Sequence, residues 1–183
     1  CKKIIQEVDG IDLSVSVTTR KIRKDEIEGK DYFFRSESEF KVLKSNNEFL
    51  ETAIVFGYFY GTLKREIISK IDNGIDVIVD IDWQGTRQIQ KYIPNDIVKV
   101  FILPPSIKEL ENRLGKRASE DEKNFLKRMS EARKEISHYV EYDFVIINKE
   151  IETAVSQIKS ILFAERQRSF RQLNLKEVIK KLK

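Results

Sequence analysis

Two arginines, Arg20 and Arg23, follow directly on a run of hydroxyl-bearing residues between Ser14 and Thr19. An arginine side chain presents a planar fork of donors that pairs with two phosphate oxygens, and Ser and Thr hydroxyls add hydrogen bonds without adding charge. Because two arginines three positions apart can converge on one anion, this segment predicts a phosphate-binding site. The alternative is an exposed strand end with solvated charges.

Acidic residues end an apolar run in the middle of the chain. Residues Ile75 to Asp82 predict a buried parallel strand, and Asp80 and Asp82 at its end face the same side because they are two positions apart. Two such carboxylates can share a ligand or a hydrated Mg²⁺. The alternative for Asp82 is capping of the helix that follows it. Asn148 ends another predicted strand, and ligands of parallel sheets bind at such carboxyl ends.

Glu51 is a carboxylate within a β-rich segment. A positioned carboxylate can accept two hydrogen bonds from the N–H donors of guanine, whereas adenine offers an acceptor at one of these positions, so Glu51 could supply base selectivity. In isolation, a solvent-facing strand residue is the simpler interpretation.

A charged stretch between two predicted helices carries arginines that can close over phosphates. These candidates are Arg113, Arg117, Arg128 and Arg133. Phosphoryl transfer depends mainly on positioning and charge neutralisation, which mobile arginines supply. A helical hairpin held by salt bridges is the alternative. Together with the phosphate clamp, Glu51 and the paired acids, this arm indicates a nucleoside monophosphate bound beside a magnesium nucleotide.

The elements that must position these residues alternate between strand and helix after residue 62. Predicted strands are Leu13–Thr19, Asp31–Arg35, strands around glycine turns in 47–62, Ile75–Asp82, Ile97–Leu103 and Tyr142–Asn148. Predicted helices are Lys2–Val8, Ser38–Asn46, Leu63–Asp72, Gln84–Tyr92, Ser106–Leu114 and Ile151–Arg168. The alternation predicts an α/β core with a parallel sheet, into which a β-rich insertion from about Ser16 to Thr62 has been placed.

Composition narrows the class of protein. The 183 residues suit one domain, and 40% hydrophobic with 35% charged residues is typical of a soluble globular protein. No apolar run approaches the roughly 20 residues of a membrane span, so we expect a cytoplasmic protein without membrane contact. One Cys and one His exclude an internal disulfide and make a zinc site unexpected. The net charge of +4 lies mostly in residues 164–183, which read as a solvated basic helix rather than a specific nucleic-acid site.

The chain resembles the guanylate kinases, in the bacterial style, over essentially its whole length. The motifs that carry the resemblance are Ser14–Arg23, Glu28–Phe34, Phe49–Glu51, Tyr60–Thr62, Asp80–Gly85, Leu103–Ser106, Arg113–Leu114 with Arg117 and Arg128, and Tyr142–Asn148. The fold implied is that of a P-loop nucleoside monophosphate kinase. It has a parallel-sheet core (about 1–15, 63–112 and 134–183), an inserted GMP-binding lobe (about 16–62) and a helical lid (about 113–133).

The resemblance also implies an activity and a role for each site residue. The γ-phosphoryl group of ATP is transferred to GMP with Mg²⁺, giving GDP and ADP. The GMP phosphate is held by Arg20, Arg23, Tyr32 and Tyr60, and guanine is read by Ser16, Glu51, Thr62 and Asp80. Asp82 acts near the metal through water, Arg117 and Arg128 stabilise the transferring group with help from Arg113 or Arg133, and Asn148 and Arg117 bind ATP. GMP and ATP are the expected partners, and a homo-oligomer is left open.

One departure from the family pattern concerns the ATP phosphates. The glycine-rich loop Gly-x-x-Gly-x-Gly-Lys-Ser/Thr, which cradles phosphates with backbone N–H groups, does not occur in the 183 residues. Because Lys2–Ile5 resembles the helix that follows this loop, we expect the loop to precede Cys1. The alternative is a non-catalytic guanylate-kinase-like module that binds proteins. Arginines in the lid favour the enzyme over this binding module, which has no evident need for them.

Overall fold

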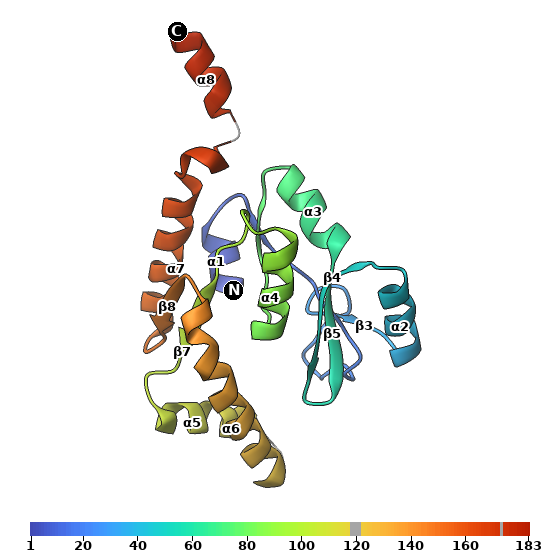
Figure 1. Ribbon diagram of the computed structural model, residues 1–183. Helices are drawn as coiled ribbons and strands as arrows, with labels where there is room; N and C mark the ends of the chain where they lie inside the picture. Colours follow the sequence, from blue (N-terminus) through green and yellow to red (C-terminus); the bar gives the residue numbers. More distant parts are fainter. Residues whose placement is uncertain (118–121, 173) are drawn as a thin grey trace.

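The core of the fold contains two separate pairs of parallel strands. In the computed structural model, which describes residues 1–117, 122–172 and 174–183, β1 (Ile11–Leu13) pairs with β6 (Asp76–Ile78) and β7 (Val100–Leu103) pairs with β8 (Phe144–Ile147). Helices flank both pairs (Figure 1). The predicted α/β architecture with parallel strands is therefore confirmed.

The core strands are shorter and less buried than the sequence predicts. The strand predicted over Ile75–Asp82 ends at Ile78, and its residues are half-buried. The strand predicted over Ile97–Leu103 begins at Val100, and the side chain of Ile102 is 47% exposed. Apolar runs predicted these strands correctly, but burial depends on neighbours that a run of residues does not reveal.

Four helices cover the core strands, and two apolar clusters hold them in place. In one cluster, Ile4 of α1 (Lys2–Glu7) and Val155 of α7 (Ile151–Arg166) pack with residues of β1 and β6. In the other, Ile67 of α3 (Lys64–Asp72) and Ile89 of α4 (Trp83–Tyr92) pack with Leu50. Leu50 belongs to the inserted β-rich segment, so the second cluster joins that segment to the core.

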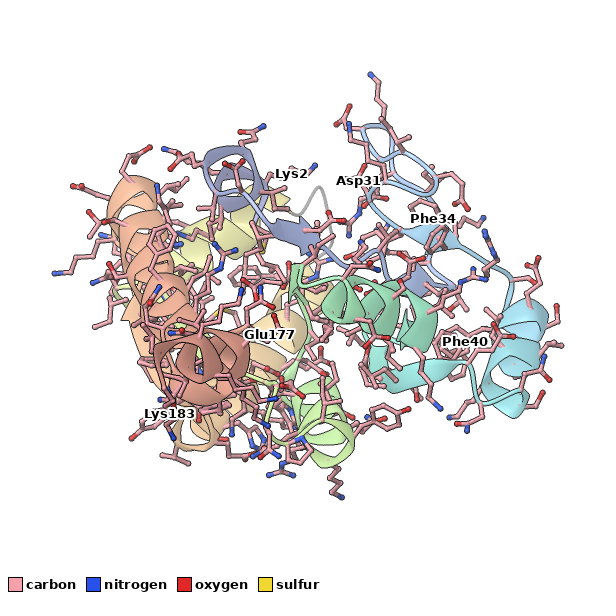
Figure 2. The ribbon with its side chains drawn as sticks, turned by 90° about the horizontal axis from the view of Figure 1, so that it is seen from above. Lys2, Asp31, Phe34, Phe40, Glu177 and Lys183 are labelled. Atoms are coloured by element: carbon pink, nitrogen blue, oxygen red, sulfur yellow. The ribbon has the colours of Figure 1, made fainter. Side chains whose placement is uncertain are left out.

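The inserted segment forms its own sheet, which we call the lobe (residues 17–63). Its strand order is β3 (Phe33–Phe34), β2 (Val17–Thr18), β5 (Tyr58–Leu63) and β4 (Phe49–Val55). The helix α2 (Glu37–Ser45) begins at a capping box between Ser36 and Glu39 and buries Phe40 against Phe49 and Phe59, at ring distances of 4.6 and 5.3 Å. Seen from above, Phe34 and Phe40 lie on the opposite side of the molecule from Lys183 (Figure 2).

The single strand predicted over Leu13–Thr19 is wrong. Residues 11–13 pair with β6 in the core, whereas Val17 and Thr18 pair with β3 and β5 in the lobe. The alternation of apolar and hydroxyl residues reports which way each side chain faces, but it does not report the partner strand. The chain crosses from core to lobe in residues 14–16, so Ser16 lies at the junction.

The strands β4 and β5 form a hairpin with a tight turn at Phe56 and Gly57. Both residues have positive φ angles, 52° and 84°. A two-residue turn of this kind matches the twist of the flanking strands, and Gly adopts it without strain whereas Phe does so at some cost. The turn therefore holds the Phe56 ring at the exposed end of the lobe.

Two helices form an arm beside β7 and β8. They are α5 (Ile107–Arg117) and α6 (Glu122–Ser137), and the short helix η1 (His138–Glu141) leads back to β8. Beyond α7, the predicted basic helix is interrupted, because η2 (Ser169–Arg171) precedes α8 (Leu175–Leu182), which projects from the rest of the molecule (Figure 1). In the described parts of the chain, no helix is long and apolar enough to cross a bilayer.

Candidate active site

A buried carboxylate lies at the boundary between the lobe and the core. Glu51 on β4 is 3% exposed, and its Oε1 accepts a hydrogen bond of 2.7 Å from the Thr62 hydroxyl on β5. The Ser16 hydroxyl lies 3.4 Å from that of Thr62. Three of the residues predicted to read guanine are thus brought together, and the solvent-facing alternative for Glu51 is wrong.

The register of the hairpin accounts for this arrangement. Phe49 pairs with Leu63, but Glu51 pairs with Thr62, so the pairing shifts at Leu50. A bulge of this kind redirects side chains, here placing Glu51 opposite Thr62 while Leu50 packs into the core.

Burial changes the acid–base behaviour of Glu51. Desolvation is the largest cause that raises the pKa of this carboxyl to about 7. The hydrogen bond from Thr62 acts in the opposite direction, and the charge of Asp82 makes a smaller contribution that also raises the pKa. A carboxyl of this kind is easily brought to its ionised form near neutral pH by a ligand that donates hydrogen bonds to it.

The predicted phosphate clamp assembles around Arg20. Its guanidinium lies 5.5 Å from the centre of the Tyr32 ring, and the Tyr32 and Tyr60 rings are 6.0 Å apart. The carboxylate of Glu26 binds both terminal nitrogens of Arg20, at 2.6 and 3.0 Å, and also accepts a hydrogen bond from the backbone N–H of Arg23. The hydrogen bond from Arg20 holds the pKa of Glu26 below its usual range. Glu26 therefore orients the arginine fork, and the Arg23 side chain is exposed beside it.

Asp80 and Asp82 differ in their surroundings, contrary to the prediction of two acids at a buried strand tip. Asp80 is exposed, and its charge contributes, after burial and Tyr60, to the raised pKa of Tyr32. Asp82 caps α4, since its Oδ1 accepts from the N–H of Gly85 at 3.0 Å. The capping alternative for Asp82 is therefore confirmed.

The end of the arm is joined to the start of α4. Glu135 on α6 accepts a hydrogen bond of 3.1 Å from the N–H of Trp83. The ring of Trp83 stacks on His138 at 3.9 Å, and Arg87 lies over the same ring at 4.6 Å. Glu141 completes the group, because it binds Arg87 through two hydrogen bonds and His138 through one. These contacts give His138 a structural role.

The four arm arginines occupy different positions. Arg113 binds Glu109 at 2.7 Å and the backbone carbonyl of Asn148 at 3.0 Å, which brings two predicted ATP-side residues together. The guanidinium of Arg128 lies 5.2 Å from the Phe56 ring, so the arm reaches the tip of the lobe hairpin. Arg133 lines a cavity of about 580 Å³ between α5 and α6. The side chain of Arg117 lies outside the described residues.

Metal binding by the protein alone is not supported by the described side chains. Across residues 1–117, 122–172 and 174–183, no group of three His, Cys, Asp or Glu could hold a metal ion. Both oxygens of Asp82 already accept hydrogen bonds, from Gly85 and from Gln84. A single carboxylate of this kind fits a hydrated Mg²⁺ carried by substrate phosphates, which keeps several of its waters.

Several residues of the site were not predicted as functional. They are Glu26, Gly85, Gln88 and Glu135. Spacing gave a signal for Glu26, which lies three positions after Arg23 in a charged loop, and for Gly85, which lies three positions after Asp82 in the motif Asp80–Gly85. Gln88 and Glu135 contact the site through tertiary neighbours, so their types and spacing carry no local signal.

An α/β core that carries an inserted lobe with a buried carboxylate and an arginine–tyrosine cluster, beside an arginine-bearing arm, has the architecture expected of a nucleotide phosphotransferase. Residues 2–165 match the sequence model of the guanylate kinase family. The chain is 42% identical to the guanylate kinase of Nitrobacter winogradskyi over 98% of its own length and 82% of the relative's. It is 46% identical to that of Gluconobacter oxydans, over 91% of this chain and 80% of the relative.

A solved structure agrees with these relatives. The crystal structure of guanylate kinase from Anaplasma phagocytophilum superposes with a TM-score of 0.85 at 39% identity, covering 98% of this chain and 87% of that one. The chain therefore belongs to the guanylate kinase family. The predicted fold class and the assignment as an ATP:GMP phosphotransferase are confirmed at the level of the family.

Proposed function

We propose that the lobe binds GMP, with Glu51 reading guanine and Arg20 holding the phosphate, and that ATP binds to the core and the arm. In this proposal the core comprises about 1–15, 63–112 and 134–183, and the part of the arm at about 113–133 is the lid. The observation that carries this proposal is that one small lobe holds both the buried, hydrogen-bonded carboxylate of Glu51 and a cluster of Arg20 with two tyrosines. A glutamate exposed on a strand would be neither buried nor held by a hydrogen bond, as Glu51 is.

Guanine recognition follows from the donors and acceptors of the pocket. The Oε2 atom of Glu51 and the second lone pair of Oε1 can accept hydrogen bonds from N1–H and the 2-amino group of guanine. Ser16, Thr62 and Asp80 complete the polar surroundings. Adenine presents an acceptor at its N1 position, and pairing with the carboxylate would then be lost, so AMP is excluded.

The charged residues have proposed roles in binding the GMP phosphate and in transfer of the phosphoryl group. Arg20 and Arg23 pair with the GMP phosphate, with Tyr32 and Tyr60 donating hydrogen bonds. An oxygen of this phosphate attacks the γ-phosphorus of ATP in line, while the bond from that phosphorus to the bridging oxygen of ADP breaks. Arg117 and Arg128 stabilise the charge on the transferring group, with Arg113 or Arg133 assisting, and Asn148 lies near the ATP base.

Magnesium has one proposed role in this scheme. Asp82 would hold Mg²⁺ through its water shell, and the ion would supply charge neutralisation at the ATP phosphates. The residues of the protein bind and orient the two nucleotides and exclude water from the site. Because the acceptor is already a phosphate anion, no strong general base is required.

A binding experiment tests the base-reading role. Calorimetric titration of the intact protein with GMP, IMP and AMP should give affinities in that order, because IMP lacks the 2-amino donor and AMP lacks the N1–H donor. The Glu51→Gln variant should bind GMP about 10- to 100-fold more weakly, the range expected for hydrogen bonds to a charged group. Glu37→Gln, at an exposed position on α2, is the matched control. Equal affinities for GMP and AMP would rule the proposal out.

A further inference from the structure

Gly85 on α4 lies directly against the carboxylate of Glu51. A β-carbon at position 85 would stand 2.7 Å from Oε2 and 3.1 Å from Cδ of Glu51. Non-bonded atoms do not approach so closely, and Glu51 is too buried to move aside freely. The absence of a side chain at position 85 therefore makes room for the carboxylate.

Gln88, almost one turn further along α4, holds the strand that carries Glu51. Its Oε1 accepts a hydrogen bond of 3.1 Å from the N–H of Thr52, and its Nε2 donates one of 2.8 Å to the Thr52 carbonyl. β4 is an edge strand of the lobe sheet. The carboxamide of Gln88 thus pairs with the open edge of β4 as a neighbouring backbone would, at the residue next to Glu51.

The same turn of α4 also fixes Asp82, because the N–H of Gly85 donates to its carboxylate. One short segment therefore contacts the acid that caps the helix and the acid predicted to read the base. The charge of Asp82 also contributes, after burial, to the raised pKa of Glu51.

We propose that Gly85 and Gln88 are positioning residues for guanine recognition. Gly85 leaves the space that the Glu51 carboxylate occupies, and Gln88 fixes β4 so that this carboxylate faces the base. The inference rests on the proposed role of Glu51 and adds two residues that act on selectivity for the base through Glu51.

Gly85→Ala is the most direct test. In the intact enzyme, kcat/KM should fall about 10- to 100-fold for GMP and less for IMP, because IMP lacks the 2-amino group that pairs with the carboxylate. The KM for ATP should stay unchanged. Lys91→Ala, at an exposed position on the same helix, is the control. Alanine is the better helix former at both positions, so a loss at 85 cannot come from helix propensity.

A double-mutant cycle separates positioning from general packing. In a Glu51→Ala background, Gly85→Ala should lower kcat/KM for GMP by less than twofold, since the carboxylate it displaces is gone. An equal loss in both backgrounds would overturn the proposal.

Gln88→Glu provides an independent variant in case Gly85→Ala does not fold. A carboxylate cannot donate to the Thr52 carbonyl, so the ratio of kcat/KM for GMP to that for IMP should fall. A ratio equal to that of the unmodified enzyme would overturn the proposal. If the unmodified enzyme itself fails to prefer GMP to IMP, the proposed role of Glu51 fails instead, so the two failures are distinguishable.

Discussion

Thr62 donates a hydrogen bond of 2.7 Å to the almost completely buried carboxylate of Glu51. This single contact does not offset desolvation, because the pKa of Glu51 is still raised from 4.5 to about 7. The folded protein therefore holds a proton that the unfolded chain releases between these two pH values. The stabilisation that this proton provides is fully present below pH 4.5 and is lost as the pH rises through about 7.

The Glu51→Gln variant should be more stable than the unmodified protein at pH 8, by an amount on the order of 3 kcal/mol. Glutamine stays neutral, so it does not carry the cost of a buried charge. At pH 5 the two proteins should have similar free energies of unfolding, as measured by urea denaturation. A stability difference of the same size at both pH values would contradict the raised pKa.

GMP affinity should rise about tenfold between pH 6 and pH 8, because the ionised fraction of a carboxyl with a pKa of about 7 rises by that factor. Only the ionised form accepts both guanine donors. Calorimetry at several pH values measures the change, and Glu51→Gln provides the reference for titration of the GMP phosphate. If the variant shows the same pH dependence as the unmodified protein, Glu51 is not its source.

Replacement of Arg20 by Lys should raise the KM for GMP about 10- to 100-fold. Lysine keeps the charge but loses the planar fork that binds two oxygens, and it cannot reproduce both hydrogen bonds to Glu26. Steady-state kinetics with GMP as the varied substrate measures this change. Arg35→Lys is the control, because Arg35 lies in the same lobe and pairs with the partly exposed Glu28. A similar loss in both variants would point to damage of the lobe as a whole.

Replacement of Arg128 by Ala should lower kcat at least 100-fold while changing the KM for GMP by less than about threefold. An arginine that stabilises only the transferring phosphoryl group contributes to the transition state and little to ground-state binding. Single-turnover kinetics with saturating nucleotides measures the step directly. Arg65→Ala, at an exposed position on α3, is the control. An increase in KM with kcat unchanged would assign Arg128 to binding instead.

The sequence predicted the residue types of the site better than their surroundings. The hydroxyls and arginines of 14–23 predicted a phosphate clamp, because phosphate chemistry restricts which side chains can serve, and the structure places Arg20 beside Tyr32, whose ring contacts Tyr60. Apolar periodicity located the helices α3, α4 and α7 to within about two residues at each end. These are properties of local sequence, which is why they could be read without a structure.

Other features depend on contacts between segments that are distant in the chain. The division of Leu13–Thr19 between two sheets depends on partner strands, and the burial of Glu51 depends on a register shift in the hairpin. Glu135 reaches Trp83 from 52 positions away, and Gln88 reaches Thr52 from 36. No spacing rule relates such pairs, so local patterns could not predict them.

The most direct test of the central claim is ADP formation from Mg-ATP by the intact protein, with GMP and AMP as alternative acceptors. The account predicts rapid ADP formation with GMP and little with AMP, together with slower GMP-dependent turnover in Glu51→Gln at low GMP concentration and in Arg128→Ala at all GMP concentrations. A folded, intact protein that forms no ADP with either acceptor, or that uses AMP as readily as GMP, would contradict it.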